Sequence, residues 1–306
     1  MPANDTLFCK GAAWFDYDND NATDLFLNNL QGSAQLFRND GHGRFVDVTH
    51  QLNIDGPQMG FGCWAWDYDN NGWLDIFATS YERNVAKTVA GIQGQSVGPA
   101  PCRLFQNQDA QFTSRADEAG LDGVYETMGC NFADIDNDGW LDFYLGTGDP
   151  ELSTLIPNRM FHNKMGNRFT EISASSGTGH LQKGHAVSFG DWDRNGDLDL
   201  FIQTGGAING DKYHNILFQN PGHDSHRVTL RLIGRAENRA ALGVRLKVLT
   251  DDPGPRQICR MISSGEQLWG QYAGTNNRTG HRHFDPRARN PLACYRHHTS
   301  AAGDSC

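Results

Sequence analysis

Four acidic stretches with one shared spacing constrain this chain more than any other feature. Each has Asp or Asn at its first, third and fifth positions, has Asp at its ninth, and runs directly into a short hydrophobic segment. The stretches are DYDNDNATD at 16–24, DYDNNGWLD at 67–75, DIDNDGWLD at 134–142 and DWDRNGDLD at 191–199. Alternate side chains of a tightly curled loop point inward, so these oxygens are expected to converge. The sixth position is Gly in the last three stretches and Asn21 in the first, and both residue types tolerate a left-handed turn.

The side chains at these positions would form a cage for a hard cation. All of them offer oxygen, and the seventh residue can add its backbone carbonyl, a set that suits calcium better than zinc or copper. We therefore predict up to four Ca²⁺ sites, one per loop. The predicted ligand residues are Asp16, Asp18, Asp20, Ala22, Asp24, Asp67, Asp69, Asn71, Trp73, Asp75, Asp134, Asp136, Asp138, Trp140, Asp142, Asp191, Asp193, Asn195, Asp197 and Asp199.

The EF-hand is the obvious rival interpretation of this spacing. An EF-hand needs Glu at the twelfth position and a helix on each side of the loop. The twelfth position here is occupied by Leu27, Ala78, Leu145 and Ile202, and each of these residues lies inside a hydrophobic, strand-like run. The sequence therefore excludes an EF-hand.

The segments between the loops repeat as well. The loops begin at 16, 67, 134 and 191, which are 51, 67 and 57 residues apart. In each repeat a Gly- and aromatic-rich run precedes the loop, a hydrophobic strand follows it, and a third strand ends in an L-F-x-N or M-F-x-N pattern. A turn then leads to a fourth strand in the first and third repeats. Four antiparallel strands per repeat are typical of a β-propeller blade, so we predict an all-β fold with four visible blades.

These units resemble the FG-GAP/VCBS repeats of integrin-α-like β-propellers over residues 7 to about 220. The resemblance implies calcium in the loop that joins the first two strands of each blade. It also implies that the four visible blades are part of a seven-bladed propeller. Residues 226–269 resemble the start of the ASPIC/UnbV domain that follows such propellers in the cartilage acidic protein family, and the resemblance ends there.

The predicted domain organisation follows from these patterns. Residues 1–221 are expected to form the blades, and 222–269 a partial ASPIC/UnbV-like β domain, a small β module with alternating strands at 228–233 and 241–248. Residues 270–306 show no strand periodicity and are predicted to be an irregular or disordered tail.

Composition limits the classes of partner and the cellular location that are expected for this protein. The formal net charge is −10, and much of the acidity lies in the four loops. No strongly basic patch precedes residue 227, so nucleic acid is not an expected partner. The sequence contains neither a membrane-spanning run nor a signal peptide, whereas the family resemblance implies an extracellular or periplasmic location. The seven cysteines form no C-x-x-C pair, which favours buried thiols over a disulfide framework.

Two functional hypotheses remain. The first is a calcium-binding scaffold for binding or adhesion, with a protein or carbohydrate ligand as its partner. The alternative is a propeller-type hydrolase or an enzyme accessory domain, which would need an acid or histidine with a perturbed pKa outside the four loops. The sequence contains no G-x-S-x-G elbow, and no catalytic constellation is recognised. The 82–101 insert is predicted to be an exposed loop that would carry specificity.

Overall fold

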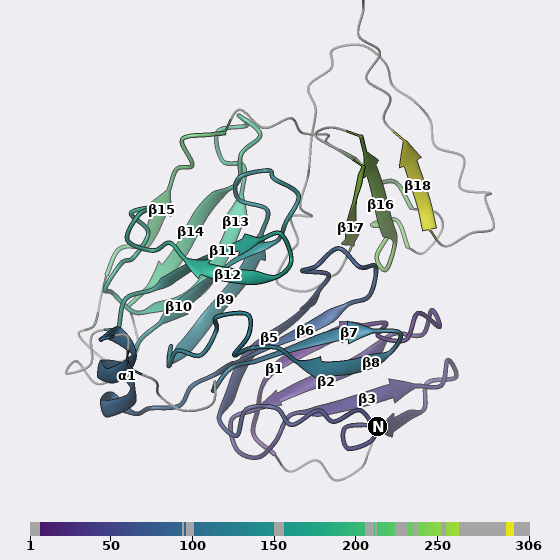
Figure 1. The fold of residues 1–306 in the computed structure, drawn as a ribbon, viewed down its shortest axis with the longest axis horizontal. Coiled ribbons are helices and arrows are strands. Elements are labelled where there is room, and N and C mark those ends of the chain that lie inside the picture. Colours follow the sequence, from purple (N-terminus) through teal and green to yellow (C-terminus); the bar gives the residue numbers. More distant parts are fainter. Residues whose placement is uncertain are drawn as a thin grey trace, which may run out of the picture.

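The computed structural model of the protein describes residues 7–93, 95, 101–149, 156–205, 211, 213–223, 230, 232–234, 238–251 and 255–262, together with the backbone of 292–296. Its regular structure in these residues is β apart from one short helix. The strands form four antiparallel sheets arranged as the blades of a β-propeller, followed by a smaller sheet (Figure 1). The predicted all-β propeller fold is confirmed.

The blades follow one another along the chain. The first contains β1 (Cys9–Phe15), β2 (Asp24–Asn29), β3 (Gln35–Asn39) and β4 (Phe45–Asp47). The second contains β5 (Gly60–Trp66), β6 (Asp75–Ser80), β7 (Arg103–Gln108) and β8 (Gln111–Ser114). The third contains β9 (Thr127–Ala133), β10 (Asp142–Thr147), β11 (Arg159–Lys164) and β12 (Arg168–Glu171). The fourth contains, among the described residues, β13 (Gly184–Gly190), β14 (Asp199–Thr204) and β15 (Ile216–Phe218).

Glycines let the first strands of neighbouring blades approach closely. β1 lies against β5, and β9 lies against β13. A Cβ atom on Gly11 would stand 2.3 Å from the carbonyl oxygen of Phe61, and one on Gly129 would stand 2.6 Å from that of His185. Only a residue without a side chain fits such contacts. The equivalent residue of the fourth blade is Ala186, whose side chain is exposed.

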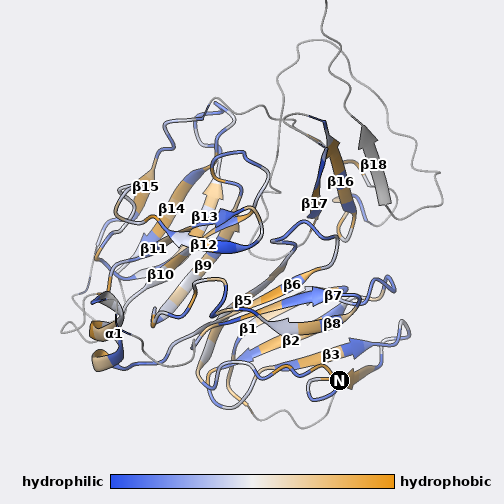
Figure 2. Ribbon diagram, viewed as in Figure 1, coloured by the Kyte–Doolittle hydropathy of each residue, from blue (hydrophilic) through white to orange (hydrophobic). Residues whose placement is uncertain are grey.

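The hydrophobic core lies between blades. Phe15 and Phe26 of the first blade pack in one cluster with Ile76 of the second. Trp66 of the second blade stacks on Phe169 of the third, with ring centroids 5.6 Å apart. Figure 2 shows hydrophobic residues on blade strands such as β6 and β14, and hydrophilic residues on β12 and on many of the connecting turns. Adjacent blades therefore stabilise one another, and this packing fixes the positions of the loops at the ends of the strands.

A smaller sheet follows the blades. β16 (Arg245–Thr250) pairs antiparallel with β17 (Arg256–Met261) and parallel with β18 (Leu292–Arg296). β16 starts later than the predicted 241–248 strand because Ala241 and Gly243 adopt positive φ angles of 55° and 79°. Residues 228, 229 and 231 of the predicted 228–233 strand lie outside the described residues, and 230, 232 and 233 are not in a strand.

The 82–101 insert contains α1 (Val85–Ile92), so the prediction of a loop was wrong over these residues. Asn84 caps this helix, because its side chain accepts a hydrogen bond from the backbone N–H of Lys87. Within the described residues, no helix has both the length and the apolar character needed to cross a bilayer. The predicted domain boundaries, including the tail at 270–306, stay predictions.

Candidate cation-binding loops

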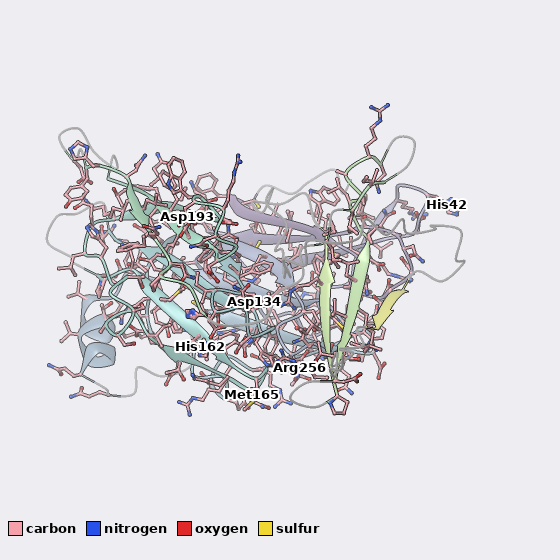
Figure 3. All side chains as sticks on the ribbon, turned by 90° about the horizontal axis from the view of Figure 1, so that it is seen from above. His42, Asp134, His162, Met165, Asp193 and Arg256 are labelled. Atoms are coloured by element: carbon pink, nitrogen blue, oxygen red, sulfur yellow. The ribbon has the colours of Figure 1, made fainter. Side chains whose placement is uncertain are left out.

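The structure brings three of the predicted carboxylates together in each of the four loops, whereas Asp20 and Asp197 belong to no such group within the described residues. Ligand oxygens of three aspartates lie within 4.8 Å of one another in each loop. The groups are Asp16, Asp18 and Asp24; Asp67, Asp69 and Asp75; Asp134, Asp136 and Asp138; and Asp191, Asp193 and Asp199. Asp142 joins a further group with Asp136 and His162. Figure 3 labels Asp134, His162 and Asp193, which belong to the third and fourth blades.

The ninth-position aspartate ties each loop to the rest of its blade. In the third blade, Asp142 accepts one hydrogen bond from the backbone N–H of Ile135, at 3.1 Å, and another from that of Asn163, at 2.7 Å. The same two contacts recur at Asp24, Asp75 and Asp199. Asn163 is the last residue of the M-F-x-N pattern in β11, so this pattern and the acidic loop are joined by a hydrogen bond.

The turn within each loop depends on two left-handed residues. In the third loop these are Asn137 and Gly139, with φ angles of 56° and 89°. Gly139 then donates its N–H to Asp134 at 3.0 Å. Asn21 adopts the same conformation in the first loop, with φ 68°, and donates to Asp16 at 3.1 Å. The replacement of Gly by Asn therefore preserves the loop geometry.

Fifth- and seventh-position residues also contact each other. Asp138 accepts from the backbone N–H of Trp140 at 2.8 Å, and Asn71 accepts from that of Trp73 at 2.7 Å. The equivalent bonds join Asp20 to Ala22 and Asn195 to Asp197. The part that the seventh-position carbonyls would play in binding a cation stays a prediction.

The third loop contains a buried oxygen with no hydrogen-bond partner. Asp134 is 5% exposed, and its Oδ1 atom accepts no hydrogen bond, whereas Oδ2 accepts from Gly139 and from Arg260. An unsatisfied buried carboxylate oxygen is costly, and a bound cation would remove that cost. The residues present therefore fit a hard cation.

Burial raises the pKa of several loop carboxyl groups. The pKa of Asp24 and of Asp67 rises to about 7, and that of Asp134 to about 6. Burial raises the pKa values of Asp75 and Asp142 well above the usual range, and neighbouring aspartates add to the effect. The loops thus concentrate more negative charge than their own hydrogen-bond donors stabilise, as expected of sites that bind a cation.

One set of residues that contact the loops was not predicted from the sequence. The variable residue of the L-F-x-N or M-F-x-N pattern donates to the third-position aspartate in the loop of its own blade. Gln106 reaches Asp69 at 2.6 Å, and the imidazole of His162 lies 2.9 Å from Asp136. Arg38 and Gln219 make the equivalent contacts, with Asp18 and Asp193. The signal that could have revealed them is a polar residue recurring between Phe and Asn in all four blades.

Glu126 and His185 are buried or half-buried groups outside the loops whose pKa values are perturbed. Glu126 is 1% exposed, its Oε2 atom has no hydrogen-bond partner, and burial followed by the nearby Asp149 raises its pKa to about 7. Burial lowers the pKa of His185, whose charged neighbours are Asp211 and Lys183. The hydrolase hypothesis needs such groups, but these two have different charged neighbours and share no hydrogen bond within the described part of the chain.

Comparison with known proteins supports the repeat architecture. Residues 16–78, which contain the first two loops, match the family model of the FG-GAP-like repeat. The repeat propeller is thus supported by both sequence and fold. Cartilage acidic protein 1 of Mus musculus is 39% identical over 56 residues, a match that covers 18% of this chain and 9% of that protein. The chain therefore matches only a small part of that relative's length.

Proposed function

We propose that this protein is a calcium-binding repeat protein whose propeller serves as an extracellular-type scaffold for a protein or glycan partner. The observation that carries the proposal is the buried Oδ1 atom of Asp134, which has no hydrogen-bond partner and belongs to a cluster of three aspartates. Every other described blade also has a cluster of three aspartates in its loop, at the first, third and ninth positions. The match of residues 16–78 to the FG-GAP-like repeat supports the scaffold role.

Calcium in the loops would stiffen the joints between blades. The side-chain amide of Asn163 donates to the carbonyl oxygens of Tyr68, in the second loop, and Leu141, in the third. Asn107 and Asn220 make the equivalent pair of bonds across their own blade boundaries. A cation that orders one loop would thereby fix the carbonyl oxygen that accepts a hydrogen bond from the asparagine of the next blade. This coupling gives calcium a structural role in the scaffold.

The compartment and the C-terminal module belong to the same proposal. Loops of this kind in extracellular modules bind calcium with dissociation constants of about 10⁻⁴ to 10⁻³ M, a range that suits an extracellular or periplasmic protein. The β16–β17 hairpin lies within residues 222–269, which we assign to a partial ASPIC/UnbV-like module.

Thermal unfolding tests the calcium proposal. Millimolar calcium is expected to raise the Tm of the full chain, and a chelator to lower it, because binding to the native state stabilises it. Asp134→Asn should remove part of the calcium response. Asp109→Asn is the matched control, since Asp109 is exposed in a turn with φ 53°, which Asn tolerates. A Tm that is identical in calcium and in chelator would contradict the proposal.

A further inference from the structure

The β16–β17 hairpin lies on the loops of the first three blades. Arg245 of β16 donates to the carbonyl oxygen of Asp16 at 2.7 Å, and its guanidinium also lies 3.5 Å from the Asp16 carboxylate. Arg256 of β17 donates to the carbonyl oxygen of Asp138 at 2.6 Å. The hairpin thus brings arginine side chains to the face of the propeller that carries the predicted cation sites. Figure 3 labels Arg256 on the hairpin and Asp134 in the third loop.

Asn70, the fourth residue of the second loop, fixes the position of the hairpin. Its carbonyl oxygen accepts from the side chain of Gln257 at 2.7 Å, and its Oδ1 accepts from the backbone N–H of Cys259 at 2.9 Å. Its own side-chain amide donates to the carbonyl oxygen of Gly139 at 2.9 Å. Asn70 is 5% exposed, so these bonds are shielded from water and define one docked arrangement.

Arg260 makes the contact with the most direct chemical consequence. Its Nη2 atom lies 3.1 Å from Oδ2 of Asp134, and its Nη1 atom donates to Oδ1 of Asn70 at 3.2 Å. The side chains of Arg260 and Asp134 are 11% and 7% exposed, so the ion pair is largely buried. Asp134 is also the first predicted ligand of the third loop. One carboxylate therefore serves both the hairpin and the predicted cation site.

We propose that docking of the β16–β17 hairpin and binding of a divalent cation to the third loop oppose each other, with Arg260 as the residue that couples them. This inference rests on the proposed calcium function and names the regulation of the same site. A guanidinium beside a ligand carboxylate repels an incoming dication. Conversely, a bound dication weakens the attraction that holds Arg260 in its buried position.

The strength of this coupling is expected to differ from loop to loop. Arg245 applies a weaker version of it to the first loop, because its guanidinium lies farther from the Asp16 carboxylate than that of Arg260 does from Asp134. The hairpin residues Arg245, Arg256, Gln257 and Arg260 bond to the first three loops. The fourth loop is thus the internal reference, since its affinity should not depend on the hairpin.

Two measurements on the full chain test the coupling. Calcium affinity is measured by isothermal titration calorimetry. Hairpin docking is measured by the rate at which a maleimide labels Cys259, read by peptide mapping, because the thiol of Cys259 is buried in the docked state. The variants are Arg260→Gln and Asp134→Asn. Arg103→Gln is the control for the loss of one positive charge, since Arg103 begins β7 and pairs with exposed Asp55.

A change that weakens hairpin docking is expected to tighten calcium binding, and calcium is expected to weaken docking. Saturating calcium should raise the undocked fraction of the wild-type hairpin, and with it the labelling rate of Cys259, by about tenfold. By reciprocity, the loss of docking in Arg260→Gln should tighten one calcium site by a similar factor. Arg260→Gln should also label rapidly whether or not calcium is present. Asp134→Asn should label rapidly in chelator. Arg103→Gln should behave as the wild-type protein does. A purely structural role of Arg260 would not tighten calcium binding.

The ways to overturn the proposal are distinct. Calcium that binds without changing the labelling rate, or that slows it, would contradict the coupling and leave the calcium function intact. An Arg260→Gln variant with unchanged or weaker calcium affinity would contradict it as well. A wild-type protein that binds no calcium would overturn the calcium function, and the coupling with it.

Discussion

The four loops share one pattern but occupy two environments. The covered loops, 67–75 and 134–142, bond to neighbouring blades and to the β16–β17 hairpin, which reaches the first loop only through Arg245 among the described contacts. The open loops, 16–24 and 191–199, are more exposed over their central residues. Asp134 is buried, whereas Asp191 at the same loop position is exposed. The second residue shows the same contrast, because Ile135 packs against the core between the third and fourth blades and Trp192 is 74% exposed.

The difference teaches that ligand spacing and ligand environment are separate properties. The spacing sets which oxygens converge, and it is the same in all four loops. The environment sets how strongly burial opposes the charges on those oxygens when no cation is bound. The covered loops should therefore depend more on calcium than the open ones.

The largest expected effect concerns the asparagines that join blades. Asn163→Ala should lower the free energy of unfolding by about 3 kcal/mol, because it leaves the carbonyl groups of Tyr68 and Leu141 without their donor. Asn39→Ala should cost about 1 kcal/mol, since Asn39 donates only to the exposed carbonyl of Thr23 in its own loop. Urea denaturation of both variants in calcium measures the contrast. Equal losses would contradict a stabilising role for the bond across the blade boundary, which Asn163 makes and Asn39 does not.

A second prediction concerns a buried carboxyl group outside the loops, whose effect on stability should not depend on a cation. Glu126 is buried outside the loops, and its pKa rises from 4.5 to about 7 in the folded protein. The folded state then binds more protons than the unfolded state between these two pH values, so stability should fall as pH rises through this window. Glu126→Gln should flatten that fall by on the order of 2 kcal/mol.

The control for this prediction is calcium itself. The contribution of Glu126 should be the same in calcium and in chelator, because the residue lies at the end of the third blade away from the loop. Denaturation curves from pH 4.5 to 7.5 for both proteins measure it. A variant whose pH profile matches that of the wild-type protein would show that Glu126 does not titrate in this range.

The smallest expected effect compares the second residue of a covered and an open loop. Trp192→Ser should change the free energy of unfolding by less than about 0.5 kcal/mol, because the indole is exposed. Ile135→Ser should cost about 1 to 2 kcal/mol, because it removes apolar contacts with the core between blades. Matched urea curves test the pair. A larger loss for Trp192→Ser would show that the fourth loop is covered in solution.

Much of the fold could be predicted because it repeats. The acidic spacing, the hydrophobic segment after each loop and the L-F-x-N pattern are local signals, and their recurrence defines the blades. The pairing of Arg260 with Asp134 could not be predicted in this way, since it joins residues 126 positions apart and belongs to no repeat. The helix α1 was missed because it has only eight residues, and Val85, Thr88, Val89 and Gly91 have low helix propensity.

The loops were predicted more fully than their surroundings. Each loop brings three of its predicted aspartates together, because the turn is set by the local sequence, and their role as ligands stays a prediction. The donors that orient those ligands, such as Gln106 and His162, come from another strand. Their contacts with the loop depend on how the strands of the blade pair, and this pairing is seen only in the folded structure.

The most direct test of the central claim is the anomalous scattering of crystals grown in millimolar calcium. The account predicts a peak in the covered loop 134–142, with Asp134, Asp136 and Asp138 oxygens at about 2.3 to 2.6 Å from it. It predicts further peaks at the loops beginning at Asp67 and Asp191. A map with no peak at any of the four loops would contradict the account.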